Sequence, residues 1–233
     1  AAPGPVVKAT LNALRKARVV TVIRAVDSDA ALERACDLVK NCGCRAIEIT
    51  RDSHAWLDVL RGIVEKVGDQ AVVGVGTILS AEDVHAAAAN GAKFALSPVN
   101  PPGFVSACLD ANVLAVPGCF TPQEVFNAIA DGASLIKIFP AQNFGVTSLR
   151  ALRSISHFRA VCFLATGGID EAGAHEWFDA GCAVVGMGAL ICGRDLGTQD
   201  PRRAAELRQA YLADGGGRSI AQGILERLKL TDA

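Results

Sequence analysis

Lys137 is the residue whose setting most directly suggests chemistry. It lies within Leu-Ile-Lys-Ile-Phe-Pro, among apolar neighbours that would strip water from an ammonium group. Burial disfavours the charged form and lowers the pKa of a lysine from its usual value of about 10.4. A neutral amine can attack a ketone and form an imine, which then withdraws electrons from the neighbouring carbon. The structural alternative is a lysine on an exposed edge strand, or one whose side chain extends to water.

Glu48 is the second candidate, within Ala-Ile-Glu-Ile-Thr. A buried carboxylate needs a partner or a raised pKa, and either would suit a general acid–base that moves protons during imine formation. The alternative is a structural ion pair with an arginine such as Arg24. If Glu48 and Lys137 point into the same interior, the catalytic interpretation is favoured.

Glycines close the last two apolar runs of the sequence. Thr166-Gly167-Gly168 ends one run and Gly186-Met187-Gly188 ends the next. Such glycines let backbone N–H groups approach an anion, although glycine pairs are also common in ordinary turns. Their occurrence after both runs predicts a substrate that carries a phosphate group.

Eight apolar, β-branched runs alternate with segments of helical length. The runs cover Val19–Ala25, Ala46–Thr50, Ala71–Ile78, Lys93–Pro98, Val113–Gly118, Leu135–Pro140, Ala160–Gly168 and Ala183–Gly188. Strand–helix alternation predicts parallel strands, because parallel neighbours need crossover connections. Eight such units predict a (β/α)₈ TIM barrel of the α/β class, and no GxGxxG follows the first run. A closed barrel has no exposed edge strand, which favours a catalytic Lys137.

Helix ends support the same units. Glycines just before the next strand predict left-handed helix ends, and small polar residues predict helix caps. The glycines are Gly43, Gly91, Gly132 and Gly181; the caps are Ser28, Ser80, Asp170 and Thr121-Pro122. We expect an N-terminal helix over Pro5–Lys16 to close the barrel bottom, and a C-terminal helical tail over Arg202–Leu228, broken at the glycines 215–217. No linker separates a second domain, so residues 1–233 are expected to form a single domain.

Composition narrows the possible partners. Hydrophobic residues make up 51% of the 233, but no apolar run reaches the roughly 18 residues of a membrane span. The net charge of −1 gives no basic stripe, so neither nucleic acid nor a membrane is expected as a partner. No cluster of His, Asp and Glu offers a metal site, and no cofactor is expected. The eight cysteines lie mostly in apolar segments and predict reduced, buried thiols.

Seven motifs together resemble the 2-keto-3-deoxy-6-phosphogluconate (KDPG) and 4-hydroxy-2-oxoglutarate (KHG) aldolases. They keep their order from about residue 5 to 193: Val-Val-Thr-Val-Ile-Arg-Ala, Ile-Glu-Ile-Thr, Gly-Val-Gly-Thr-Ile-Leu, Leu-Ser-Pro, Val-Pro-Gly-Cys-Phe-Thr-Pro-Gln-Glu, Ile-Lys-Ile-Phe-Pro-Ala and Ala-Thr-Gly-Gly-Ile. The resemblance implies a class I aldolase barrel, usually a homotrimer, that splits a phosphorylated keto acid into pyruvate and glyceraldehyde 3-phosphate.

The resemblance also implies a role for individual residues. Lys137 would form the Schiff base and Glu48 would shuttle protons. The pyruvate side would be lined by Arg24, Thr77, Pro98 and Phe139, and phosphate would be bound through the backbone of Gly167, Gly168 and Gly188.

Two positions depart from the family pattern. Asp52 stands where some members have arginine, and Ala189 stands where members often have serine, which removes one hydrogen bond to phosphate. KHG aldolase activity is therefore one alternative, and a catalytically reduced trimeric scaffold is another. A phosphate-binding isomerase or synthase is a third alternative, but it gives Lys137 no role. We expect a cytoplasmic location, or an organelle stroma if a transit peptide preceded Ala1.

Overall fold

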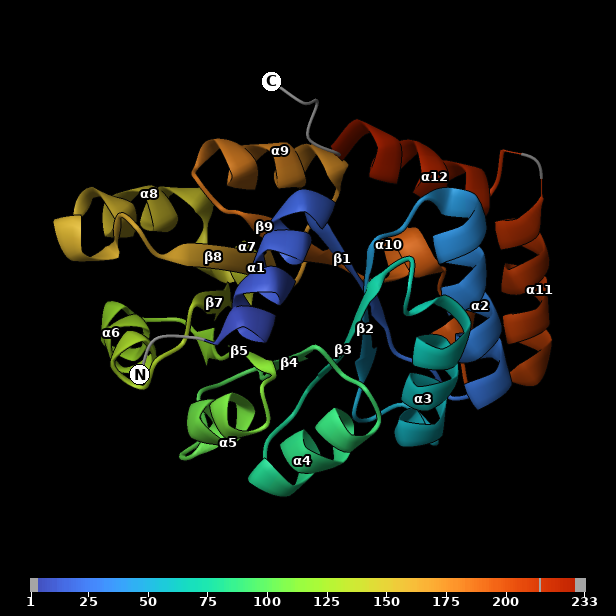
Figure 1. Cartoon of the computed structure of the whole chain (residues 1–233). Helices are drawn as coiled ribbons and strands as arrows, with labels where there is room; N and C mark the ends of the chain where they lie inside the picture. Colours follow the sequence, from blue (N-terminus) through green and yellow to red (C-terminus); the bar gives the residue numbers. More distant parts are fainter. Residues whose placement is uncertain (1–3, 214, 229–233) are drawn as a thin grey trace.

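The computed structural model describes residues 4–213 and 215–228 and contains a nine-stranded parallel sheet rolled into a barrel (Figure 1). The strand order is β5-β4-β3-β2-β1-β9-β8-β7-β6, and every pairing between neighbours is parallel. The strands are β1 (Val19–Ile23), β2 (Ala46–Thr50), β3 (Val72–Gly76), β4 (Phe94–Leu96), β5 (Leu114–Val116), β6 (Gly118–Cys119), β7 (Leu135–Ile138), β8 (Cys162–Thr166) and β9 (Val184–Met187).

The ninth strand arises because Pro117 splits the predicted fifth run. β5 pairs with β4, and β6 pairs with β7. Proline has no N–H to give to a ladder, so the strand is interrupted there. The Pro117 carbonyl still accepts the backbone N–H of Lys137 at 2.9 Å. The chain itself therefore closes the ring, and the predicted eight-unit barrel is confirmed with one of its strands broken in two.

Helices surround the strands, as Figure 1 shows. They are α1 (Pro5–Ala17), α2 (Ser28–Cys42), α3 (Trp56–Val67), α4 (Ala81–Ala89), α5 (Phe104–Asp110), α6 (Pro122–Ala130), α7 (Ala141–Phe144), α8 (Val146–Ser154), α9 (Glu171–Asp179), α10 (Ala189–Cys192), α11 (Pro201–Leu212) and α12 (Gly217–Leu228). None of the helices in the described part of the chain is long and apolar enough to cross a membrane.

Alternation along each strand divides the core into two clusters. On β2, Ile47 and Ile49 belong to the cluster between sheet and helices, whereas Ala46 belongs to the cluster inside the barrel. On β7, Ile136 faces the helices and Leu135 faces inward in the same way. Because side chains alternate along a strand, every second residue after Ala46 and Leu135 also points into the barrel.

The amino end of the barrel is closed by α1, as predicted. Val7 and Leu14 of this helix are buried in the inner cluster together with Val20 and Phe94. The inner cluster also contains strand residues such as Ala46 and Leu135, which begin β2 and β7. Helix α1 therefore covers the amino end of the barrel.

The predicted glycine helix ends are confirmed. Gly43, Gly91, Gly132 and Gly181 all have φ between 74° and 103°, which side chains with a Cβ rarely adopt. One predicted cap was wrong. Asp27, not Ser28, caps α2, because its carboxylate accepts the Ala30 N–H at 3.0 Å while Ser28 is already helical. The expected caps at Ser80, Thr121 and Asp170 are present.

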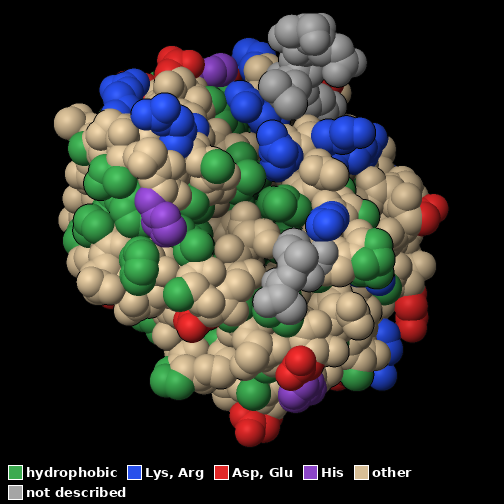
Figure 2. Space-filling model, turned by 60° about the vertical axis from the view of Figure 1, so that its left-hand side comes forward, with side chains coloured by type: hydrophobic (Ala, Val, Ile, Leu, Met, Phe, Trp, Pro, Cys, Tyr) green, Lys and Arg blue, Asp and Glu red, His purple; other side chains and the backbone are tan. Residues whose placement is uncertain are grey.

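Apolar side chains also remain at the surface around α6 and α8. Phe120, Phe126 and Ile155 are 43%, 48% and 49% exposed. The face in Figure 2, which brings the α6 and α8 side of Figure 1 forward, shows hydrophobic side chains gathered on one part of it. None of the eight cysteines, all within the described residues, forms a disulfide bond, and six of them are buried.

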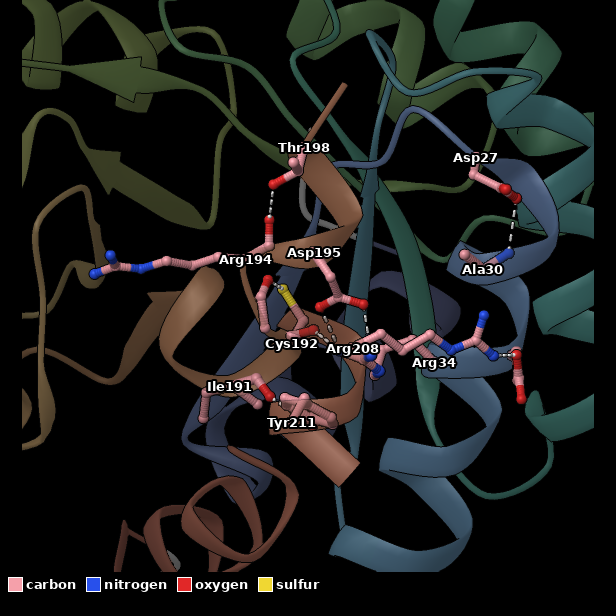
Figure 3. A network of polar contacts seen from close by, with 12 residues as sticks. Asp27, Ala30, Arg34, Ile191, Cys192, Arg194, Asp195, Thr198, Arg208 and Tyr211 are labelled. Atoms are coloured by element: carbon pink, nitrogen blue, oxygen red, sulfur yellow. Dashed lines mark hydrogen bonds and ion pairs between the residues drawn. The ribbon is translucent and has the colours of Figure 1, made fainter. Parts of the chain in front are cut away.

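The predicted C-terminal tail consists of α11 and α12, held to the barrel by a buried polar network (Figure 3). Arg34 of α2 forms two hydrogen bonds with Asp195 and one with the Cys192 carbonyl, and its guanidinium stacks 3.7 Å from the Tyr211 ring. Tyr211 of α11 donates its hydroxyl to the Ile191 carbonyl at 2.8 Å. Side chains of α2 and α11 thus satisfy carbonyls at the end of α10, which a helix end leaves unpaired.

Candidate active site

Glu48 and Lys137 lie in the barrel interior, two residues beyond Ala46 and Leu135 on the inward face of their strands. Their side chains are almost fully buried, with 3% and 6% exposure. β2 and β7 lie on opposite sides of the barrel, so Glu48 and Lys137 face each other across its interior although they are far apart in the sequence. Each side chain is close enough to affect the pKa of the other. Both belong to the layer above the apolar cluster, toward the carboxyl ends of the strands.

Burial shifts both pKa values toward the neutral forms. Removal from water raises the pKa of Glu48, which the positive charges of Lys137 and Arg24 counteract. Removal from water lowers the pKa of Lys137; Arg24 lowers it further, and Glu48 counteracts the shift. A lysine that loses its proton more easily and a carboxyl that keeps its proton longer suit a nucleophilic amine beside a proton donor.

Arg24 follows β1 at the barrel mouth and forms an ion pair with Asp52, not with Glu48. The structural alternative for Glu48, an ion pair with Arg24, is therefore wrong. Asp52, which departs from the pattern expected of the family, forms this ion pair. The contact depends on how the loops after β1 and β2 meet, so the sequence alone did not indicate it.

The remaining residues predicted for the pyruvate side also lie at the carboxyl ends of strands. The Phe139 ring lies 4.8 Å from Lys137 Nζ, and Pro98 directly follows Ser97 at the end of β4. Thr77 follows β3 with a φ of 60°. A β-branched residue rarely adopts that backbone conformation, and such strain occurs preferentially at functional sites.

The three glycines predicted for phosphate lie at the same end of the barrel. Gly167 and Gly168 follow β8 with φ of 100° and 75°, and Gly188 follows β9 and precedes α10. Sequence analysis missed Gln142, whose side-chain amide occupies the space a Cβ on Gly168 would need. Gln142 directly follows the motif Phe-Pro-Ala, and this position could have indicated it as a residue near the site. Ala189 is exposed as the first residue of α10.

No group of three or more His, Cys, Asp or Glu side chains able to hold a metal ion occurs within residues 4–213 and 215–228. A mostly apolar groove of about 610 Å³ lies at the amino end of the barrel, beside α1. Its lining includes neither Glu48 nor Lys137. The ionisable groups and the strained backbone meet instead at the carboxyl end, which makes that end the candidate active site.

These features define the class of the protein as an α/β barrel with a lysine and a glutamate buried in its interior. A family model described as KDPG and KHG aldolase matches residues 10–206. The chain therefore belongs to the KDPG and KHG aldolase family, whose members are carbon–carbon lyases.

Individual relatives agree with this assignment. The 2-dehydro-3-deoxy-6-phosphogalactonate aldolase of Escherichia coli K12 is 32% identical over 174 residues, covering 75% of this chain and 84% of the relative. The 2-dehydro-3-deoxy-phosphogluconate aldolase of Haemophilus influenzae is 33% identical over 160 residues, covering 68% and 74%.

Two solved structures share the fold. A structure described as native KDPGal has a TM-score of 0.73 and 27% identity, covering 90% of this chain and 95% of that one. A cube-shaped cage designed by fusing symmetric oligomeric domains has a TM-score of 0.70 and 27% identity, covering 91% and 74%.

Proposed function

We propose that this protein is a Schiff-base aldolase that cleaves KDPG to pyruvate and glyceraldehyde 3-phosphate. The observation that carries the proposal is the nearly complete burial of Lys137 in the barrel interior with Glu48 in the same layer. Arg24, Thr77, Pro98 and Phe139 would contact the pyruvate portion. The backbone of Gly167, Gly168 and Gly188 would hold the phosphate.

The chemistry begins with the neutral Lys137 amine. It attacks the keto carbon, and loss of water gives a protonated imine. Glu48 removes the proton of the C4 hydroxyl as the C3–C4 bond breaks, and the electron pair moves into the iminium to form an enamine. Protonation of the enamine carbon and hydrolysis then release pyruvate and restore the free amine.

The three candidate substrates differ in the configuration of one carbon atom or in the presence of a phosphate group. KDPG and its phosphogalactonate counterpart differ in configuration at C4 and give the same two products, so the same lysine chemistry serves both. The E. coli relative makes the phosphogalactonate compound the nearest alternative. KHG lacks a phosphate and would leave the three glycines without a ligand.

The test is borohydride reduction in the presence of pyruvate, followed by peptide mass mapping and by coupled assays of pyruvate release from the three substrates. We expect a reduced adduct on Lys137 and faster release from the phosphorylated compounds than from KHG. An adduct on another lysine would overturn the mechanism. A protein that forms no adduct and releases no pyruvate would support the catalytically reduced scaffold instead.

We also propose a homotrimer formed by a single domain over residues 1–233, with a phosphorylated keto acid and pyruvate as its small-molecule partners. The related cage of fused oligomeric domains and the exposed Phe120, Phe126 and Ile155 support self-association. Light scattering should give three times the mass of 24.2 kDa. Cysteines that form no disulfide bond support a reducing compartment, the cytoplasm or an organelle stroma.

A further inference from the structure

Gly76 on β3 faces the barrel interior directly beside the Glu48 carboxyl. A Cβ built on Gly76 would overlap Glu48 Oε1 and Cδ outright and would lie 2.9 Å from Cγ, whereas real Cβ atoms essentially never approach a heavy atom within 3.0 Å. Gly76 is not among the residues with positive φ. A side chain at position 76 would therefore displace the Glu48 carboxyl, whereas the backbone conformation of Gly76 does not itself demand glycine.

We propose that Gly76 is a positioning residue for Glu48. The space left by its absent side chain holds the carboxyl group in the barrel interior, in the layer of Lys137. Glu48 is only 3% exposed and its neighbourhood is close-packed, so the carboxyl would have to turn away if a methyl group took that space. This inference rests on the proposed function, because it assumes that the position of Glu48 limits the rate.

The adjacent inward position of β3 shows that glycine serves a different purpose there. A Cβ on Gly74 would lie 2.4 Å from the Phe94 carbonyl oxygen and 2.5 Å from Phe94 Cδ2, within the apolar cluster at the amino end. Gly74 therefore makes room for the backbone and ring of Phe94, and Gly76 makes room for an ionisable side chain. The two glycines are one inward step apart on the same strand.

The test is a double-mutant cycle of Gly76→Ala and Glu48→Ala, with Val75→Ala as the control. Val75 is fully buried on the opposite face of β3, so its truncation weakens the same strand without touching Glu48. Gly76→Ala should lower kcat for KDPG cleavage by about 10²-fold with a small change in KM, because a displacement of about 1 Å can cost that much. Its pH–rate profile should also shift, whereas Val75→Ala should keep the profile of the wild type.

The Glu48→Ala background separates an effect that acts through the position of Glu48 from a general weakening of β3. There the added methyl group enters vacated space, so Gly76→Ala should change the remaining rate less than about threefold, which is a strongly non-additive result. Equal losses in both backgrounds, or an unchanged Gly76→Ala enzyme, would overturn the inference. If Gly76→Ala alone does not fold, folding of the double variant would support it, and failure of both would overturn it.

Borohydride trapping of pyruvate on the wild-type protein distinguishes a failure of the proposed function from a failure of the inference about Gly76. A wild type that forms no Lys137 adduct contradicts the proposed function and with it the catalytic importance of Gly76. A wild type that forms the adduct, together with an additive cycle, contradicts only the inference about Gly76.

Discussion

The amino half of the barrel interior is filled by apolar side chains, whereas the carboxyl half holds Glu48 and Lys137. The same strands supply both halves: β2 contributes Ala46 and then Glu48, and β7 contributes Leu135 and then Lys137. Burial stabilises the first pair, because apolar area leaves water. Burial disfavours the charged forms of the second pair, as the directions of both pKa shifts show.

One inward step along a strand therefore separates a residue that stabilises the fold from a residue that can take part in chemistry. The apolar half is closed by Val7 and Leu14 of α1. Glu48 and Lys137 lie next to this apolar half, and burial is the largest cause of their pKa shifts. Substitutions in the two halves should consequently have different signatures.

The largest expected effect in the carboxyl half is that of Lys137→Ala. Loss of the nucleophile should reduce KDPG cleavage by on the order of 10⁴-fold or more, because no other group can form the imine. Steady-state pyruvate release measures this, and borohydride should no longer attach pyruvate to residue 137. Turnover near that of the wild type would refute the assignment of the nucleophile.

Glu48→Gln should reduce kcat by about 10² to 10⁴-fold, because the amide cannot accept and return a proton. Pyruvate release again measures it, with a far-UV spectrum to show that the variant is folded. A variant with wild-type kcat would remove Glu48 from the mechanism.

The same variant should be more stable than the wild type at neutral pH. The folded-state pKa of Glu48 is raised by burial, so its ionisation costs stability once the pH exceeds the unfolded-state value of about 4.3. The advantage of Glu48→Gln should vanish below that pH, where the carboxyl is protonated in both states. Thermal unfolding of both proteins across pH measures the difference, and an advantage that persists in acid would contradict this account.

Phe94→Ala tests the amino half. Phe94 is fully buried in the inner cluster, so its truncation should lower the free energy of unfolding by about 3–5 kcal/mol. Denaturant unfolding measures this loss. The folded variant should keep kcat within a few-fold of the wild type, and a large fall in kcat at full folding would show that the two halves are not separable.

Tyr211→Phe gives the smallest expected effect and lies in neither half. The lost hydrogen bond to the Ile191 carbonyl should lower the free energy of unfolding by about 1 kcal/mol, because the ring still stacks on Arg34. Thermal unfolding measures it. A loss as large as that of Phe94→Ala would mean that the tail carries as much of the stability as the core.

Sequence analysis could locate Lys137 and Glu48 because an ionisable residue inside an apolar run departs from the local pattern. It could also place Gly167 and Gly168 after β8, and the structure shows the left-handed backbone that requires glycine there. It misplaced one helix cap at Ser28, because Asp27 and Ser28 are both good cap residues and only the backbone decides between them. Pro117 could be seen in the sequence, but the break in strand pairing that it causes could not.

Local sequence is enough to define the apolar runs, the helices between them and the residues whose burial would change their protonation. These depend on short-range periodicity and on the chemistry of single side chains. Which side chains meet depends instead on the folded arrangement of the chain. Arg24 with Asp52, Gly76 with Glu48 and Tyr211 with Ile191 are contacts set by strand register and helix packing. Such contacts join distant segments, and no local pattern specifies them.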